Sequence, residues 1–142
     1  MNLERAIEIA VTAHKGQTDK AGHPYILHPL KVMMALHKSD DKIVGVLHDV
    51  VEDCEGWTFD RLKNEGFSDK IVEAVKAVTQ LDPDESYPDF ILRCQKNHIG
   101  RRVKIADITD NLDIRRIDTI TDRDVVRITK YKTAMKVLVG EA

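Results

Sequence analysis

Four side chains that can bind a metal ion or a proton fall within one short stretch of the chain: His48, Asp49, Glu52 and Asp53. At about 100° per residue, a helix over 43–53 would place them on one arc, with apolar residues filling most of the other. No Lys or Arg occurs in this stretch, so the carboxylates would repel one another without a cation. Two interpretations remain open: a solvated helix face, or a divalent-metal site with mixed nitrogen and oxygen ligands.

A second polar stripe runs along the segment 102–114. Lys104, Asp107 and Asn111 follow the i, i+3, i+7 spacing of one helix face, and apolar residues flank them on both sides. Such a stripe is costly unless its members find polar partners. A Lys104–Asp107 ion pair inside the core is one solution, although Asn111 would still need a partner. On a helical wheel of this segment, the opposite arc, which is expected to face solvent, holds Arg102, Thr109, Asp110 and Asp113.

A third histidine, His28, directly precedes Pro29. Proline favours the first turn of a helix, so we expect His28 at a helix N-terminus. A lone histidine there is most simply a surface or core residue. It becomes a candidate ligand only beside the two polar segments above.

Helical periodicity dominates the rest of the chain. Leu3, Ala6, Ile7, Ala10 and Val11 form an apolar stripe, which predicts an opening helix that Gly16 ends. Residues 16–29 hold two glycines and two prolines and are predicted to form an ordered loop. No stretch alternates with period two, so we expect no sheet. The prediction is an all-α single domain over 1–142 with about seven helices, among them 29–38, 39–53, two beginning near Thr58 and Ser68, 86–97, 100–113 and 121–139.

Composition limits the class of protein. The 142 residues carry 22 basic and 24 acidic side chains, a balance that argues against nucleic acid as a partner. No apolar run approaches the roughly 18–20 residues of a membrane span, so no membrane partner is expected. Two isolated cysteines and the absence of a signal peptide favour a reducing, cytoplasmic setting. The oligomeric state is open, and a homodimer is compatible with the sequence.

In this order, the pieces resemble the HD superfamily of metal-dependent phosphohydrolases, whose signature is His … His-Asp … Asp. More closely, the chain resembles the hydrolase domain of the RelA/SpoT proteins and the stand-alone small alarmone hydrolases. The matching stretches cover 13–17, 20–29, 46–53 and 103–111. The resemblance therefore implies an HD-domain helical bundle that hydrolyses a small phosphorylated nucleotide.

The resemblance also implies roles for individual residues. Four ligands, usually for Mn²⁺, would be His28, His48, Asp49 and Asp107. Glu52 and Asp53 would orient and deprotonate the attacking water. Substrate contacts would come from Lys20, Lys104, Asn111 and Tyr131.

Two positions depart from the related hydrolases. Asp19 and Asp113 stand where those proteins usually or often carry cations. An added carboxylate repels phosphate at short range, which bears on the substrate rather than on the fold. The leading expectation is hydrolysis of the 3′-diphosphate of (p)ppGpp. The alternatives are an HD-domain nucleotidase, an NADPH phosphatase, or a regulatory module that binds nucleotide without turnover.

Overall fold

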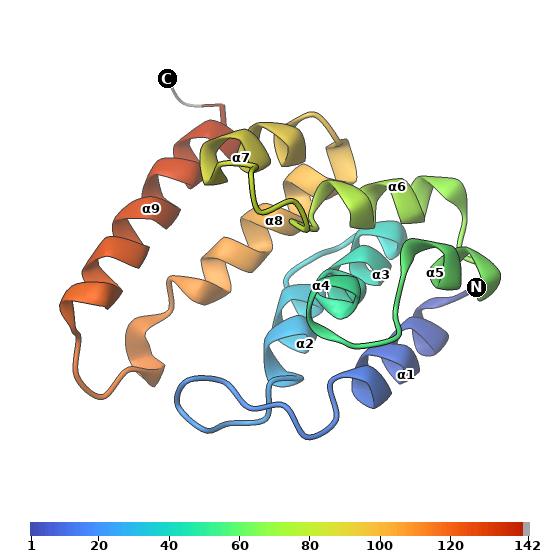
Figure 1. Cartoon of the computed structure of the whole chain (residues 1–142), viewed down its shortest axis with the longest axis horizontal. Coiled ribbons are helices and arrows are strands. Elements are labelled where there is room, and N and C mark those ends of the chain that lie inside the picture. Colours follow the sequence, from blue (N-terminus) through green and yellow to red (C-terminus); the bar gives the residue numbers. More distant parts are fainter. Residues whose placement is uncertain (141–142) are drawn as a thin grey trace.

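The computed structural model describes residues 1–140, and the elements that form its body are helices (Figure 1). The β pairing within those residues is an isolated bridge between Thr18 and Pro24. The all-α prediction is therefore confirmed, although the helices are shorter and more numerous than expected. They are α1 (Leu3–Ala13), α2 (Leu27–Met34), α3 (Ser39–Leu47), α4 (Val50–Asp53), α5 (Phe59–Asn64), α6 (Asp69–Ala77), α7 (Tyr87–Gln95), α8 (His98–Asn111), a 3₁₀ turn η1 (Ile114–Arg116) and α9 (Asp122–Leu138).

Short polar side chains set where most of these helices begin. Thr58 and Ser68 cap α5 and α6 as predicted, each accepting a backbone N–H from three residues further along. Thr121 and Asp124 form a reciprocal capping box at the start of α9. These caps satisfy N–H groups that would otherwise lack partners, and so they fix the register of each helix.

The single helix predicted over 39–53 is interrupted at His48 and Asp49, so that expectation is wrong in detail. The Nδ1–H group of His48 donates to the carbonyl oxygen of Gly45 at 2.6 Å. In a continuous helix, this oxygen would accept the N–H of Asp49. The side chain thus occupies a backbone acceptor, and the two residues lie in a turn between α3 and α4.

Helix α8 lies at the centre of the bundle and packs against α2, α3, α6, α7 and α9. Its apolar residues Val103 and Ile108 are fully buried in the core. Figure 1 shows α9 beside α8 on one side of the molecule and α1 to α6 on the other. The polar stripe of α8, Lys104, Asp107 and Asn111, lines a cavity that several of these segments border.

Helices α2 and α3 approach each other closely at Gly45. A Cβ atom at this position would lie 2.8 Å from Cδ1 of Leu36 and 3.5 Å from the Cα atom of Met33. Only glycine therefore leaves this contact undisturbed. The close approach brings the N-terminus of α2, which carries His28, towards the end of α3, which carries His48.

None of the helices within 1–140 is long and apolar enough to cross a membrane.

Candidate metal centre and active site

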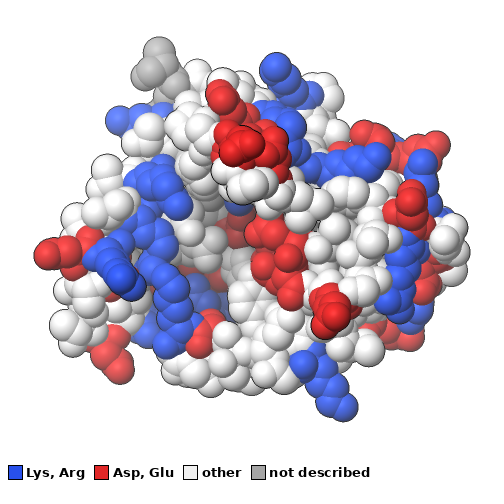
Figure 2. Space-filling model, in the orientation of Figure 1, with Lys and Arg blue, Asp and Glu red and all other residues white. Residues whose placement is uncertain are grey.

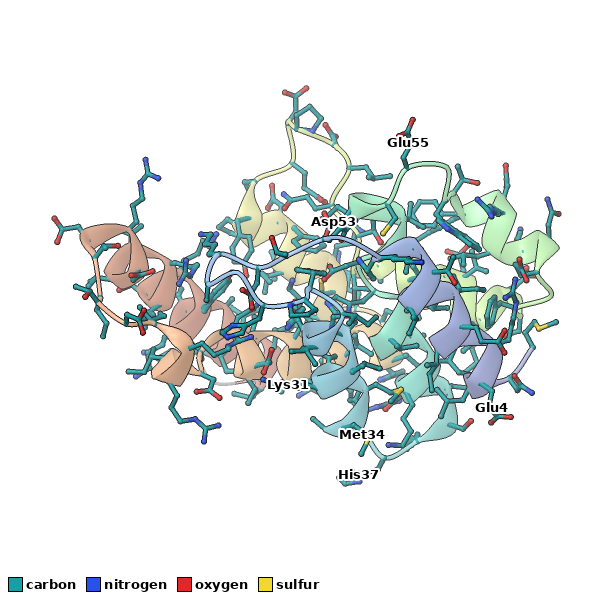
Figure 3. The ribbon with its side chains drawn as sticks, turned by 90° about the horizontal axis from the view of Figure 1, so that it is seen from below. Glu4, Lys31, Met34, His37, Asp53 and Glu55 are labelled. Carbon is teal, nitrogen blue, oxygen red and sulfur yellow. The ribbon has the colours of Figure 1, made fainter. Side chains whose placement is uncertain are left out.

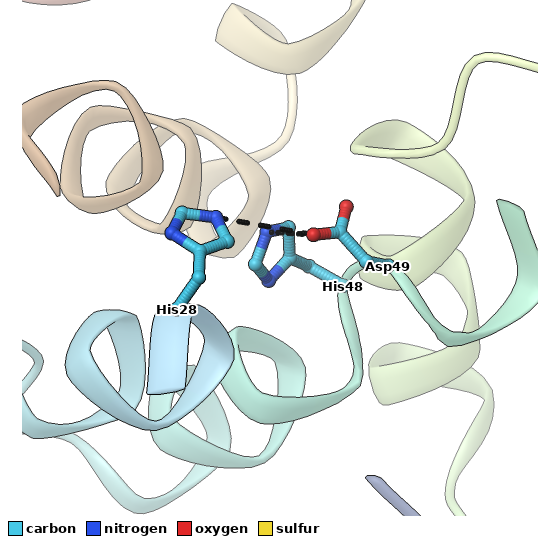
Figure 4. Close-up of side chains that lie close together, drawn as sticks. All are labelled: His28, His48 and Asp49. Atoms are coloured by element: carbon cyan, nitrogen blue, oxygen red, sulfur yellow. Dashed lines mark ion pairs between the residues drawn. The ribbon is translucent and has the colours of Figure 1, made fainter. Parts of the chain in front are cut away.

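Three separate segments bring four of the predicted residues together. His28 comes from α2, His48 and Asp49 from the turn after α3, and Asp107 from α8. His28 Nε2 lies 2.8 Å from Asp107 Oδ1 and 3.9 Å from Asp49 Oδ2. His48 Nε2 lies 3.0 Å from Asp49 Oδ2 and 3.4 Å from Asp107 Oδ1. Figure 4 shows both imidazoles directed towards the Asp49 carboxylate.

Both histidine rings are held by their other nitrogen. His28 Nδ1 donates to Asp110 Oδ2 at 2.6 Å, and His48 Nδ1 donates to the Gly45 carbonyl. This arrangement fixes the ring orientation and leaves Nε2 of each ring as the atom that faces the aspartates. A histidine ligand whose second nitrogen donates to a carboxylate or carbonyl is the usual form at metal sites.

The cluster fits a divalent cation. His48 Nε2 is fully buried and has no hydrogen-bond partner of adequate geometry among residues 1–140. Its neighbours are carboxylate oxygens, which offer lone pairs and no proton. His28, His48 and Asp49 each contribute one atom to a group within 4.8 Å of one another, a spacing that a metal ion can bridge. Imidazole nitrogens mixed with carboxylates suit a transition metal of the Mn²⁺ to Zn²⁺ series.

The electrostatics of the cluster are those of a cation site. Burial opposes the charged form of His48, but Asp49 and Asp107 outweigh it and raise its pKa well above the ordinary value. Burial would raise the pKa of Asp107, but Lys104 and the two histidines outweigh it and hold that pKa well below the usual range. The carboxylates therefore stay ionised, and protons compete with a metal ion for the imidazoles.

The polar stripe of α8 finds its partners around Asp107. Lys104 Nζ lies 2.8 Å from Asp107 Oδ2, and Asn111 Nδ2 donates to Asp107 Oδ1 at 3.1 Å. The ion pair weighed from the sequence is thus present, and Asn111 joins it. Both side chains hold the carboxylate in place from the α8 side.

The expectation that Asp110 faces solvent is wrong. Its side chain is only 11% exposed because it accepts the hydrogen bond from His28 Nδ1. Arg102, predicted on the same arc, keeps 38% of its side chain exposed while it pairs with the buried Asp41 at 2.6 Å. A helical wheel treats one helix in isolation, whereas α2 and α3 pack against this arc of α8.

Tyr25 is a residue of the site that the sequence reasoning left without a role. Its hydroxyl donates to Asp49 Oδ2 at 2.5 Å. The sequence feature that could have identified Tyr25 is its position three residues before His28, within the matched stretch 20–29. The bond fixes the Asp49 carboxylate from the side of the loop that precedes α2, residues 16–26 (the 16–26 loop).

Glu52 and Asp53 follow Asp49 on the short helix α4. Both are exposed, and each contributes a carboxylate oxygen to a group that lies within 4.8 Å together with Asp49. Glu52 Oε1 accepts the backbone N–H of Gln80 at 2.8 Å. Burial of part of each side chain and the nearby Asp49 raise the pKa of both carboxyls. A carboxylate of raised pKa is a stronger base for a proton from water.

A cavity of about 460 Å³ opens over these residues. One wall carries Asp49, Glu52 and Asp53, and Figure 2 shows acidic side chains on one side of a hollow with basic ones across it. All four predicted substrate-contact residues line the cavity: Lys20, Lys104, Asn111 and Tyr131. Arg116 and Arg127 also line it and were missed, although Arg127 stands four residues before Tyr131 on one helix face.

The two departures from the related hydrolases, Asp19 and Asp113, also line this cavity. Asp19 Oδ1 accepts the backbone N–H groups of Ala21 and His23, both at 2.9 Å. Asp113 accepts the N–H of Arg115 and pairs with its guanidinium at 2.7 Å. Both carboxylates therefore shape local turns, which reduces the repulsion that they exert on an anion.

Comparison with known proteins places the chain among its relatives. The family model for the HD domain matches residues 6–105. The chain belongs to the HD-domain family. A guanosine-3′,5′-bis(diphosphate) 3′-pyrophosphohydrolase of Aquifex aeolicus is 31% identical over 121 residues, and one of Haemophilus influenzae is 33% identical over 118. These alignments cover 78% and 73% of this chain but only 17% of each relative.

The fold also matches a solved structure. A metazoan ortholog of SpoT, a protein that hydrolyses ppGpp, superposes with a TM-score of 0.79. The match covers 96% of this chain and 84% of the other, at 21% sequence identity. This likeness confirms the HD-domain helical fold.

Proposed function

We propose that this HD-domain chain is a metal-dependent hydrolase that removes the 3′-diphosphate of guanosine-3′,5′-bis(diphosphate). The observation that carries the proposal is the arrangement of the cavity. A His/Asp cluster and two further carboxylates form one wall, and cationic side chains form the other. Such a site binds a polyanion while keeping a base close to the phosphorus under attack.

His28, His48, Asp49 and Asp107 would hold the metal ion, which we propose to be Mn²⁺. When bound, the ion would polarise a phosphoryl oxygen and lower the pKa of a water molecule. The chain supplies the remaining functions. Tyr25, Lys104 and Asn111 hold the two aspartates, and the Gly45 carbonyl holds the His48 ring.

Glu52 and Asp53 would accept the proton of the attacking water. Glu52 Oε1 accepts the backbone N–H of Gln80, whereas within 1–140 the Asp53 carboxylate accepts no hydrogen bond and Gln17 Nε2 donates only to the backbone oxygen of Asp53. We therefore propose that Glu52 orients the water and that Asp53 is free to take the proton. Hydrolysis of the 3′-ester would give guanosine 5′-diphosphate and pyrophosphate.

Lys20, Arg116 and Tyr131 line the same cavity as these carboxylates and would contact the nucleotide. The curated relatives, which carry the same activity in their names, support this choice of substrate. A cytoplasmic location follows from the same proposal, since Cys54 and Cys94 are buried free thiols that suit a reducing compartment.

The test is turnover with defined substrates. Purified protein with Mn²⁺ should release pyrophosphate from ppGpp, and the Glu52→Gln variant should release it roughly 10²- to 10⁴-fold more slowly. A panel of GMP, dGTP and NADPH in the same assay separates the alternatives. Release of phosphate from NADPH or GMP, without release of pyrophosphate from ppGpp, would replace the alarmone assignment and keep the hydrolase.

A further inference from the structure

Gln17, near the start of the 16–26 loop, contacts both segments that carry the proposed machinery. Its backbone oxygen accepts the N–H of Tyr25 at 2.9 Å, and the Tyr25 hydroxyl donates to Asp49. Its side-chain Nε2 donates to the backbone oxygen of Asp53 at 3.1 Å. Figure 3 shows Asp53 beside this loop. One residue thus joins the loop behind a proposed metal ligand to the residue that would take the proton.

The bond from Gln17 supplies a donor at the end of a very short helix. Helix α4 has four residues, Val50–Asp53, and the backbone becomes extended at Cys54. Carbonyl groups in the last turn of a helix lack an intrahelical N–H partner, and that of Asp53 is one of them. The Gln17 amide satisfies this carbonyl and so fixes the backbone from which the Asp53 carboxylate extends.

His14, the C-cap residue of α1, decides which way round the Gln17 amide lies. A backbone carbonyl only accepts hydrogen bonds, so the amide nitrogen faces Asp53 and the amide oxygen faces His14. His14 Nδ1 lies 2.7 Å from Gln17 Oε1 and therefore carries the proton and donates. The imidazole is buried, and Nδ1 also lies 3.4 Å from Cys54 Sγ. The end of α1 thereby orients the amide that holds the end of α4.

We infer that Gln17 is a positioning residue for Asp53, and that His14 holds the Gln17 amide in the orientation that this requires. This role rests on the proposed function, in which Asp53 takes the proton of the attacking water. The distance between Asp49 and Asp53 is then set by the 16–26 loop as well as by α4. An error of about 1 Å in the placement of a reacting group can cost roughly 10²-fold in rate.

The kinetic test removes the amide donor and keeps most of the side-chain volume. Gln17→Met should lower kcat on ppGpp by about 10- to 100-fold and leave KM and Mn²⁺ affinity within about twofold of wild type. The matched control is Gln95→Met, because Gln95 Nε2 makes the same kind of bond, to the carbonyl of Val137 at 2.9 Å, and neither residue lines the cavity.

Two kinetic outcomes would overturn the inference. One is a kcat for Gln17→Met equal to that of the control. The other is a loss of Mn²⁺ affinity as large as the loss of kcat, which would place the effect at the metal ligands. Gln17→Glu keeps the acceptor for His14 but has no donor for Asp53, so it should match Gln17→Met and serves if that variant does not fold.

A pair of His14 variants separates orientation of the amide from packing. His14→Asn keeps an N–H donor near the place of Nδ1 and should retain most of the wild-type kcat, whereas His14→Leu should lose as much as Gln17→Met. Because His14 acts through Gln17, combining His14→Leu with Gln17→Met should add little further loss. Equal rates in the two His14 variants, or losses that multiply, would refute the role of His14.

A chemical readout tests the contact without turnover. Cys54 Sγ lies 3.6 Å from Gln17 Nε2, and both Cys54 and Cys94 are buried. Iodoacetamide should alkylate Cys54 severalfold faster in Gln17→Met than in Gln95→Met, because the end of α4 opens more often, while Cys94 stays protected in both. Mass spectrometry assigns the label to each thiol.

Equal labelling of Cys54 in the two variants would refute the hold of Gln17 on the end of α4. If the wild type releases no pyrophosphate from ppGpp while Cys54 is labelled faster in Gln17→Met, the proposed reaction is refuted and the hold of Gln17 on Asp53 is kept.

Discussion

His28 Nδ1 donates a hydrogen bond of 2.6 Å to Asp110 Oδ2, and this bond joins α2 to α8 directly behind the His/Asp cluster. Burial would raise the pKa of Asp110, but His28 and then Arg116 lower it, so the carboxylate is ionised. An ionised acceptor makes the far nitrogen of His28 more basic and fixes its direction. Asp110 is therefore a positioning residue for the proposed metal centre.

Replacing Asp110 tests this role. Asp110→Ala should weaken Mn²⁺ binding by about 10- to 100-fold, and Asp110→Asn should weaken it less, because the amide oxygen still accepts the bond. Isothermal titration of metal-free protein measures both. Asp118→Ala, at an exposed position, is the control. Unchanged affinity in Asp110→Ala would show that the bond serves packing alone.

The two carboxylates of α4 should separate catalysis from metal binding. Glu52→Gln and Asp53→Asn are each expected to cut turnover by roughly 10²- to 10⁴-fold and to leave metal content near that of the wild type. Glu55→Gln is the matched control, since Glu55 points away from the body of the molecule, whereas Asp53 lies beside the 16–26 loop (Figure 3). Wild-type rates in both α4 variants would assign these carboxylates to a solvated surface.

Metal should stabilise the fold as well as support activity. Because the ligands come from three segments, an ion bound only by the native state raises stability by mass action, by about 2.7 kcal/mol at one hundred times its dissociation constant. Thermal melts after chelation, with and without added Mn²⁺, should show a rise in Tm that His48→Ala abolishes. A melting temperature that ignores Mn²⁺ would argue against the centre.

Asp19 should report on phosphate repulsion. Asp19→Asn keeps an oxygen that can accept the N–H groups of Ala21 and His23 but removes the charge, so KM for ppGpp should fall by about threefold at low salt and less at high salt. Asp19→Arg, which has no acceptor, should disorder the loop and raise KM. Equal KM values for wild type and Asp19→Asn at both salt concentrations would show that this carboxylate does not act on the substrate.

The segment 76–85, whose Gln80 backbone N–H donates to Glu52, should lose stability in acid. Glu85 pairs with Arg93 through two bonds of 2.9 Å, and Arg93 also donates to the carbonyls of Lys76 and Thr79, next to Gln80. The bonds from Arg93 lower the pKa of Glu85, so its contribution to stability is present above the unfolded pKa and is lost as pH falls through the folded pKa.

Glu85→Gln should therefore lower the free energy of unfolding at neutral pH by about 0.5–1 kcal/mol, a modest value because the pair is partly exposed. The difference from wild type should shrink below about pH 4. Denaturant titrations at several pH values measure it, with the exposed Glu73→Gln as control. A difference that stays constant with pH would mean that the charge of Glu85 plays no part.

The sequence by itself determined the helical class, most helix starts and the identity of the chemical groups. Apolar periodicity reports which face a helix buries, and residues such as Thr58 and Ser68 report where it begins, because both effects act within a few residues. The spacing of His48 to Asp53 and of Lys104 to Asn111 likewise lies within single segments.

Only the tertiary structure decided what depends on contacts between segments. The turn at His48 and Asp49, the burial of Asp110 against His28, and the local use of the Asp19 carboxylate follow from packing that a wheel for one helix leaves out. The cavity has the same origin, since Lys20 lines it together with Arg127 of α9, about a hundred residues further along the chain. Local rules assign a side chain to a face, and the neighbour that covers the face decides its charge, its partners and its function.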